Sequence, residues 1–275
     1  MPKKEAKERL DTYIVKKGLA KSREQAKAFI LGGIVYVNGM KVDKASLQVC
    51  EKDFIEIRME REPFVSRGGI KLDAALNTFE IDVKDKVALD VGASTGGFTD
   101  CLLKRGAQKV YALDVGYGLL DWKLRRDPRV IPIERFNVRY LKPEDLPEKA
   151  DIITVDVSFI SLMKVIPPLR KVLNKGIMIL LVKPQFEVGR GKVGPGGIIR
   201  DEDDQKKILK EIAMFCKRNQ LSILGIAESA ITGAEGNREF LLYLSNHEKG
   251  MSNVEILKRI ECLFHEKGKK DRGRR

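Results

Sequence analysis

The stretch from Val87 to Asp100, VALDVGASTGGFTD, limits most strongly what this chain can fold into. It begins with the apolar run Val87–Val91, which is typical of a buried β-strand, and continues with small residues up to Gly97. Apolar residues at helical spacing follow. The stretch therefore predicts a strand, a tight turn and a helix whose N-terminal amides face a nucleotide-like ligand. A lone glycine-rich turn is also compatible with an ordinary strand-to-helix connection that binds nothing.

The spacing of the glycines argues against a dinucleotide. The pattern G-x-G-x-x-G would need glycine at three positions, and here these are Gly92, Ser94 and Gly97, so the glycine that makes room for a pyrophosphate is missing. A second apolar run ends in Asp114, where a Rossmann-like sheet places a carboxylate against ribose hydroxyls. A nucleoside without a pyrophosphate fits better than NAD. S-adenosylmethionine is such a nucleoside, and Asp90 would lie near its positively charged end.

Apolar runs alternate with helix-patterned segments through the rest of the chain, which predicts an α/β sheet that is mostly parallel. The last two runs are too close in sequence for a crossover helix of normal length, so we expect a hairpin with one antiparallel strand. The expected strands are Val87–Val91, Val110–Leu113, Val130–Ile133, Ile152–Val155, Ile177–Val182, Ile223–Ala227 and Phe240–Leu244.

Residues 1–60 form a separate unit in this interpretation. Ser22 and Gln25 form a capping box that opens a helix, and Asn38-Gly39 between two strand patterns predicts a β-hairpin. Residues 1–44 hold eleven lysines and arginines against five acids. The segment resembles the small RNA-binding domain named after ribosomal small-subunit protein four. The resemblance implies contacts to structured RNA through its backbone and shape, made by Lys7, Arg9, Ser22, Arg23, Lys27 and Asn38.

Composition supports a polyanionic partner. The net charge of the 275-residue chain is +13, which favours nucleic acid over a merely solubilising surface. The four cysteines lack metal-ligand spacing and are typical of reduced thiols, so we expect neither a metal site nor disulfides. No apolar run has the length of a signal peptide core or a membrane span, so we expect a cytoplasmic protein without a membrane partner.

Candidate chemistry gathers where the predicted strands end. Asp156 and Lys183 each close an apolar run, a costly position unless the group is paired or used. A structural ion pair between them remains an alternative. The tetrapeptide at Asp156 reads DVSF instead of the Asp/Asn-Pro-Pro-aromatic motif of base amino-methylation, and no cysteine sits where pyrimidine-carbon methylation needs its nucleophile. A ribose hydroxyl remains as the methyl acceptor.

The motifs FVSRGGIKL, LDVGASTGGFTD, DVGYGLL, ERFNVR, TVDVSFISL, VKPQFEVGR and NREFLLYL carry a closer resemblance. Residues 64–246 are similar to FtsJ-like ribose 2′-O-methyltransferases, and the whole chain resembles the TlyA (haemolysin A-like) family of rRNA 2′-O-methyltransferases. The resemblance implies a Rossmann-like, seven-stranded S-adenosylmethionine-dependent methyltransferase domain behind a small α+β domain. Its catalytic set maps onto Lys71, Asp156, Lys183 and Glu239.

The same resemblance implies the other site residues. Arg67 would contact RNA, and Thr95 stands where stand-alone FtsJ enzymes commonly have proline. Lysine is a poor base at neutral pH unless a nearby positive charge or burial favours its neutral form, whereas carboxylates act in the opposite direction. Lys71 could supply such a charge to Lys183. We expect Lys183 as the base, Asp156 as its orienter, and Lys71 with Glu239 to position the ribose, and a purely orienting role of Lys183 stays open. Cofactor contacts are expected from Asp90, Gly92, Ala93, Ser94, Thr95, Gly96, Gly97, Phe98, Asp114, Val115, Asn137 and Asp156.

These expectations divide the chain into an RNA-binding domain (1–60), a linker (61–66), a methyltransferase domain (67–246) and a basic C-terminal helix and tail (247–275). The expected substrate is a cytidine in ribosomal RNA, free or in ribosomal subunits. Two alternatives are an RNA-binding regulator with an inactive methyltransferase domain and a membrane-active haemolysin. The second is disfavoured, because the sequence shows no amphipathic basic helix of lytic type. The modified nucleotide, the ribosomal subunit, the oligomeric state and the role of the tail stay open.

Overall fold

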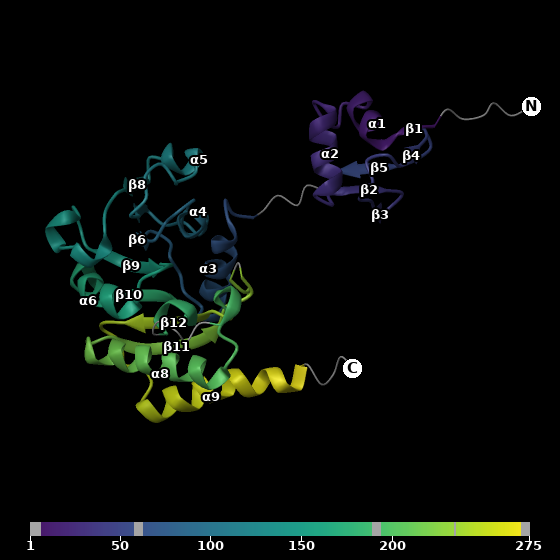
Figure 1. Ribbon diagram of the computed structural model, residues 1–275. Helices are drawn as coiled ribbons and strands as arrows, with labels where there is room; N and C mark the ends of the chain where they lie inside the picture. The colour runs from purple at the N-terminus through teal and green to yellow at the C-terminus, as the bar shows by residue number, and fades with distance from the viewer. Residues whose placement is uncertain (1–6, 58–62, 189–193, 234, 271–275) are drawn as a thin grey trace, which may run out of the picture. The chain divides into compact units, whose positions relative to one another are not determined.

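The computed structural model describes residues 7–57, 63–188, 194–233 and 235–270. The chain divides into two compact units, residues 1–62 and 63–275, and each has a hydrophobic core of its own (Figure 1). Residues 63–66, expected in the linker, belong to the second unit, because Phe64 is buried in its core. No helix in the described part of the chain is long and apolar enough to cross a membrane.

The first unit is a small α+β fold. As expected, the Ser22 hydroxyl accepts a hydrogen bond from the Gln25 amide at 3.2 Å and caps the second helix. Asn38 and Gly39 both have positive φ angles and form the predicted hairpin turn. The elements are β1 (Glu8–Arg9), α1 (Leu10–Lys16), α2 (Arg23–Leu31), β2 (Val35–Val37), β3 (Met40–Lys41), β4 (Gln48–Val49) and β5 (Ile55–Ile57).

A seven-stranded sheet organises the second unit, with strand order β11-β12-β10-β9-β6-β7-β8. β12 runs antiparallel to both of its neighbours, whereas the other pairings are parallel, which confirms the predicted late hairpin. The strands are β6 (Val87–Val91), β7 (Lys109–Leu113), β8 (Val130–Ile133), β9 (Ala150–Val155), β10 (Leu173–Val182), β11 (Ser222–Glu228) and β12 (Phe240–Ser245).

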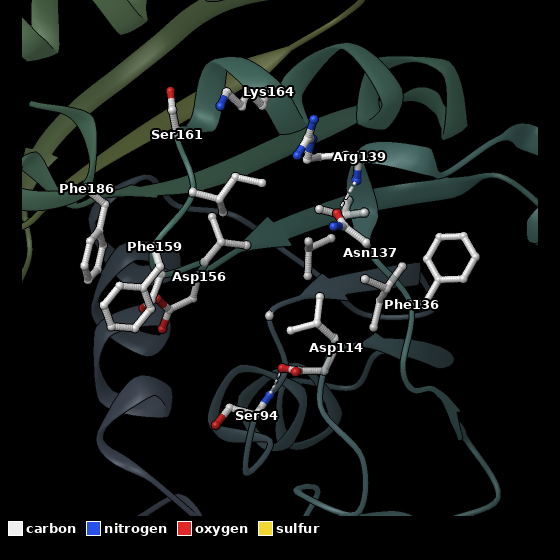
Figure 2. Close-up of a pocket in the computed structure, with 18 of the residues that line it drawn as sticks. Ser94, Asp114, Phe136, Asn137, Arg139, Asp156, Phe159, Ser161, Lys164 and Phe186 are labelled. Carbon is white, nitrogen blue, oxygen red and sulfur yellow. Dashed lines mark hydrogen bonds between the residues drawn. The ribbon is translucent and has the colours of Figure 1, made fainter. Parts of the chain in front are cut away.

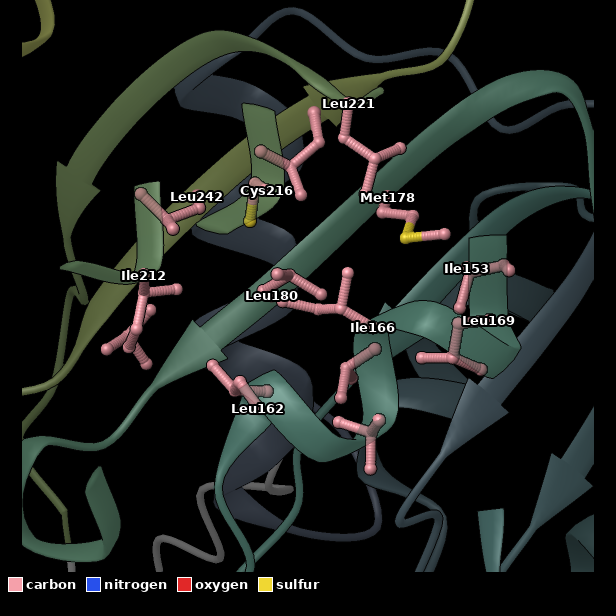
Figure 3. Packing of buried hydrophobic residues seen from close by; sticks show 14 of the residues in the cluster. Ile153, Leu162, Ile166, Leu169, Met178, Leu180, Ile212, Cys216, Leu221 and Leu242 are labelled. Atoms are coloured by element: carbon pink, nitrogen blue, oxygen red, sulfur yellow. The ribbon is translucent and has the colours of Figure 1, made fainter. Parts of the chain in front are cut away.

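Helices cover both faces of this sheet. One face packs against α6, α8 and α9, and Figure 3 shows part of that cluster. The other face packs against α3 and α4. Neighbouring strand residues alternate between the two cores, as side chains of a pleated sheet must. The helices are α3 (Arg67–Thr78), α4 (Gly97–Lys104), α5 (Trp122–Arg125), α6 (Leu162–Val172), α7 (Pro184–Glu187), α8 (Glu202–Arg218) and α9 (Asn253–Lys270), with short 3₁₀ turns at Val138–Tyr140, Pro143–Asp145 and Pro195–Gly197.

Candidate active site

The glycine-rich turn after β6 forms the centre of the site. Gly92 has φ +81°, and a Cβ atom there would lie 2.4 Å from the backbone oxygen of Asp156, so only glycine fits. The Ser94 amide donates to Asp114 Oδ2 at 2.8 Å, and the Gly116 amide donates to Oδ1 at 2.7 Å. These bonds fix the Asp114 carboxylate beside the turn, which Figure 2 shows. The predicted strand, tight turn and helix are confirmed.

A cavity of about 860 Å³ opens beside this turn. It lies over the carboxyl ends of the parallel strands, where ligands of such sheets bind. Polar groups such as the Asp114 carboxylate and the Asn137 amide line it together with apolar side chains, a lining that suits a nucleoside. Its lining residues are Val91, Gly92, Ser94, Leu113, Asp114, Val115, Leu119, Phe136, Asn137, Val138, Arg139, Asp156, Val157, Ser158, Phe159, Ile160, Ser161, Lys164 and Phe186.

A second cavity, of about 340 Å³, has Gly92, Ser94 and Asp156 in common with the first. It reaches the starts of α3 and α4, so the glycine-rich turn and Asp156 border both spaces. Its other lining residues are Ser66, Arg67, Gly68, Lys71, Ala93, Thr95, Gly97 and Phe98.

Two of the expected cofactor residues line neither cavity. Asp90 is fully buried, and its two carboxylate oxygens accept hydrogen bonds from the hydroxyls of Thr99 (2.7 Å) and Thr154 (3.1 Å). Burial raises the pKa of Asp90 to about 7, although both hydroxyls act in the opposite direction. Gly96 has φ +96° and faces Leu124, so its role is to shape the turn. Both residues support the cavity from behind.

The four expected catalytic residues form two ion pairs. Lys71 Nζ lies 2.5 Å from Glu239 Oε2, with 10% and 3% of the two side chains exposed. Lys183 Nζ lies 2.5 Å from Asp156 Oδ1 and donates to the Ser158 hydroxyl at 3.0 Å. Lys71 comes from α3, whereas its partner directly precedes β12, 168 residues away in sequence. Since Lys71 and Asp156 line the same cavity, both pairs border one space.

Each lysine thus has a carboxylate partner. We expected Lys71 to be the positive charge near Lys183, but the short contacts of both ammonium groups are to carboxylates. Asp156 and Ser158 therefore orient the Lys183 nitrogen before substrate binds.

Several residues of the larger cavity were missed by sequence reasoning. Phe159 is 91% exposed with φ +63°, and its ring centroid lies 4.8 Å from that of Phe186. Figure 2 shows both rings beside Asp156. The sequence did contain a signal for most of these residues, because they follow the ends of predicted strands within the motifs ERFNVR, TVDVSFISL and VKPQFEVGR. The missed polar and aromatic residues are Phe136, Arg139, Ser158, Phe159, Ser161, Lys164 and Phe186, of which Lys164 lies beyond these motifs, in α6.

In the first unit, Asp11 organises two of the expected RNA-binding residues. Arg9 Nε donates to its Oδ1 at 3.0 Å and Arg23 Nη2 to its Oδ2 at 2.9 Å, so that Arg9 above all holds the pKa of the buried carboxyl well below its usual range. About half of each arginine side chain remains exposed. Asn38 braces the hairpin through Asp53, at 2.8 Å.

The remaining expected RNA-binding residues are placed differently. Lys7 and Lys27 are exposed, and Ser22 is occupied as a helix cap. Arg67, in the second unit, donates to the Thr232 carbonyl at 2.9 Å and lines the smaller cavity. The structure thus leaves Lys7 and Lys27 accessible to a phosphate, while Arg67 is accessible beside the candidate site.

Comparison with known proteins identifies the class. Residues 64–246 match the model of the FtsJ-like methyltransferase family, whose members use S-adenosylmethionine, and residues 8–55 match that of the S4 domain. The YqxC protein of Bacillus subtilis is 46% identical, over 91% of this chain and 90% of its own length. The 16S/23S rRNA (cytidine-2′-O)-methyltransferase TlyA of Mycobacterium tuberculosis is 42% identical, over 86% of this chain and 89% of its own length.

A solved structure agrees over almost the whole length. A Streptococcus thermophilus protein superposes with a TM-score of 0.73 at 38% identity and covers 98% of this chain and 100% of its own. The chain belongs to the TlyA (haemolysin A-like) family, which joins an N-terminal S4 domain to an FtsJ-like methyltransferase domain.

Proposed function

We propose that this chain transfers a methyl group from S-adenosylmethionine to the ribose 2′-hydroxyl of a cytidine in ribosomal RNA. The TlyA relative carries that activity in its name. The observation that carries the proposal is the pair of lysine–carboxylate contacts, Lys71–Glu239 and Lys183–Asp156, beside the glycine-rich turn. Lys71 and Asp156 line the smaller cavity, Asp156 also lines the larger one, and Lys183 and Glu239 lie behind them, outside the lining of both. A hydroxyl acceptor needs such groups, because an alcohol is a poor nucleophile until its proton is removed or strongly polarised.

The larger cavity suits the nucleoside part of the cofactor. Asp114, fixed by two backbone amides, would accept hydrogen bonds from ribose hydroxyls, and Asn137 and Val115 would flank the base. The smaller cavity, beyond Gly92, would hold the amino-acid end against Ala93, Thr95, Gly97 and Phe98. S-adenosylmethionine supplies an activated methyl group when it is bound there.

Lys183 is the residue we assign to the acceptor proton. The 2′-oxygen would take the methyl group of the bound cofactor, which would leave as the thioether, and the hydroxyl proton would have to depart. A neutral Lys183, whose own ammonium proton has passed to solvent, would accept that proton. Asp156 and Ser158 orient its nitrogen, and Lys71 with Glu239 would position the ribose.

Other methyl acceptors fit this site poorly. A pyrimidine-carbon acceptor requires a cysteine thiolate, but burial raises the pKa of Cys101 and that of Cys216 to about 12. An inactive regulator would lack part of the catalytic set, whereas here all four side chains are present and paired. Since its substrate is ribosomal RNA, we place the enzyme in the cytoplasm, with the S4 domain binding structured RNA.

The test is single-turnover methylation of ribosomal RNA or immature subunits, followed by mass spectrometry of the nucleosides. Wild-type protein should produce 2′-O-methylcytidine. Lys183→Ala should slow the reaction by on the order of a hundredfold to ten-thousandfold, the usual contribution of a general base, and leave cofactor affinity nearly unchanged. Lys183→Arg is the control, because arginine keeps the charge but does not give up a proton near neutral pH.

Two results would contradict the assignments. An arginine variant with a near-normal rate would remove Lys183 as a base and leave an orienting role. Methylation of a base instead of the ribose would refute the proposed acceptor itself.

A further inference from the structure

Three aromatic side chains are largely exposed on the segments that follow β7 and β8, with Trp122 at the start of α5 and Tyr140 at the end of a 3₁₀ turn. Tyr117 is 67% exposed, Trp122 60% and Tyr140 66%. None of the three lines the larger cavity, so the proposed cofactor site does not account for them. Exposed aromatic side chains gathered in one region are typical of a binding surface.

Each of these rings has an arginine beside it. The guanidinium carbon of Arg135 lies 4.2 Å from the ring centroid of Tyr117, that of Arg126 5.3 Å from Trp122, and that of Arg139 5.8 Å from Tyr140. All three arginines are exposed. Within the described ranges of the chain, none of them forms an ion pair with a carboxylate, so their charges remain available to a ligand.

The acids of this region are already engaged. Glu134 accepts from the Gly118 amide at 2.8 Å and pairs with Arg125, while Asp127 pairs with Arg129. Residues 117–142 contain seven lysines and arginines against three acids, an excess of four positive charges. The Glu134 contacts also join the loop after β7 to the loop after β8. The region is therefore a cross-linked, positively charged surface.

This surface continues into the larger cavity. Leu119, two residues after Tyr117, and Arg139, directly before Tyr140, both line the cavity. Asp156, the partner of Lys183, lines the same cavity, so an RNA strand at the acceptor site and these segments border one cavity. We propose that the three arginine–aromatic pairs, which we call the stacking rim, bind unpaired nucleotides of the substrate RNA beside the nucleotide to be methylated.

The chemistry favours single-stranded over double-stranded RNA. Exposed rings bind unpaired bases by stacking, whereas the bases of a duplex offer no free faces. The adjacent arginines can contact the phosphates between the stacked bases. The inference rests on the proposed RNA substrate and deepens it, since the methyltransferase unit would itself require an unpaired strand.

The chain provides its own probe, because Trp122 is its only tryptophan. A base that stacks on Trp122 should quench its fluorescence. Titration of the full-length protein with an unpaired cytidine-containing oligoribonucleotide should give saturable quenching, and the same strand within a duplex should give far less. This measurement needs no methyl transfer, so it stays informative even if the proposed reaction is wrong.

Substitutions supply the second test. Tyr117→Ala and Tyr140→Ala should each raise the KM for RNA by on the order of 5- to 100-fold, the usual effect of losing one stacked base, with an unchanged affinity for S-adenosylmethionine. The salt slope of RNA binding should stay the same in these variants. Arg135→Gln should instead lower the slope by roughly 0.7, the contribution of one single-strand phosphate contact. Val254→Ala, an exposed apolar residue on α9, is the matched control and should change nothing.

Three outcomes would overturn the inference. The first is equal quenching by duplex and single strand, and the second is wild-type RNA affinity in the doubly substituted Tyr117→Ala/Tyr140→Ala protein. The third is that the same double variant no longer methylates intact ribosomal subunits but methylates deproteinised RNA normally, which would identify a protein partner for the rim. If the wild-type protein methylates no RNA but Trp122 is quenched as described, the proposed reaction fails and the rim stands.

Discussion

The buried ion pair between Lys71 and Glu239 allows a prediction whose magnitude follows from its surroundings. The two charged atoms lie 2.5 Å apart, and almost none of either side chain reaches solvent. Glu239→Ala leaves the Lys71 ammonium buried without a partner. Breaking such a pair typically costs about 3–5 kcal/mol of unfolding free energy, a large part of the roughly 5–15 kcal/mol that stabilises a domain.

Urea denaturation of the full chain, followed by circular dichroism, measures this cost. For a slope of about 3 kcal/mol per molar urea, the midpoint of the second unit should fall by roughly 1–2 M. Replacing both partners by apolar residues, Lys71→Met with Glu239→Leu, should restore much of the stability, because no unpaired charge then remains. The matched control is Glu148→Ala, since Glu148 pairs with Lys109 at the same 2.5 Å but on the surface, and its loss should barely move the midpoint.

The reasoning fails if Glu239→Ala is as mild as Glu148→Ala, or if the double variant loses as much stability as the two single variants together. Activity adds a separate test. The apolar double variant should fold and bind S-adenosylmethionine, yet methylate RNA poorly, because the groups proposed to position the ribose are gone.

Three further predictions concern the turn and its supports. Gly92→Ala forces a Cβ atom to within 2.4 Å of the Asp156 carbonyl, so calorimetry should show little or no S-adenosylmethionine binding, and a near-normal affinity would contradict the placement of the turn. Asp114→Ala should weaken that binding by on the order of 10- to 100-fold, through the loss of charge-assisted hydrogen bonds, and tight NADH binding instead would refute the cofactor. Asp90 ionises near pH 3.8 when unfolded but near 7 when folded, so its contribution to stability is present below about pH 4 and is lost as the pH rises to 7. Asp90→Asn should therefore be stabilised relative to wild type more at pH 8 than at pH 5, and an equal difference at both pH values would be evidence against the raised pKa.

The fold could be predicted largely from the sequence because its signals are local. Val87–Val91 and Val130–Ile133 are strands with the predicted bounds, since an apolar run flanked by turn residues cannot be buried in many other ways. β10 begins at Leu173, four residues earlier than expected. Its first part pairs with β9 across a register shift and includes the polar residues Asn174 and Lys175, so hydrophobicity gave no sign of it.

The candidate site was predictable only in part. Strand-end positions pointed to Asp114, Asp156 and Lys183, because the carboxyl ends of parallel strands meet at one edge. The Lys71–Glu239 contact joins residues 168 positions apart, and only the family resemblance placed both of them in one set. Phe159 was missed because its exposed position depends on its own positive φ angle of +63°, which a phenylalanine rarely adopts.

Asp156 connects the cofactor turn to the chemistry. Its carbonyl oxygen is the atom that excludes any side chain at position 92, and its carboxylate holds Lys183. Because one residue makes both contacts, a shift of the glycine-rich turn would also move Lys183, the lysine proposed to face the acceptor hydroxyl. Cofactor binding, which rests on that turn, should therefore affect the position of Lys183 as well as supply the methyl group. This coupling predicts that a small change in the geometry of the turn slows methyl transfer more than it weakens cofactor binding. Conservative substitutions of Ser94, whose backbone amide donates a hydrogen bond to Asp114, test this when the rate of methyl transfer and the cofactor affinity are measured on the same variant.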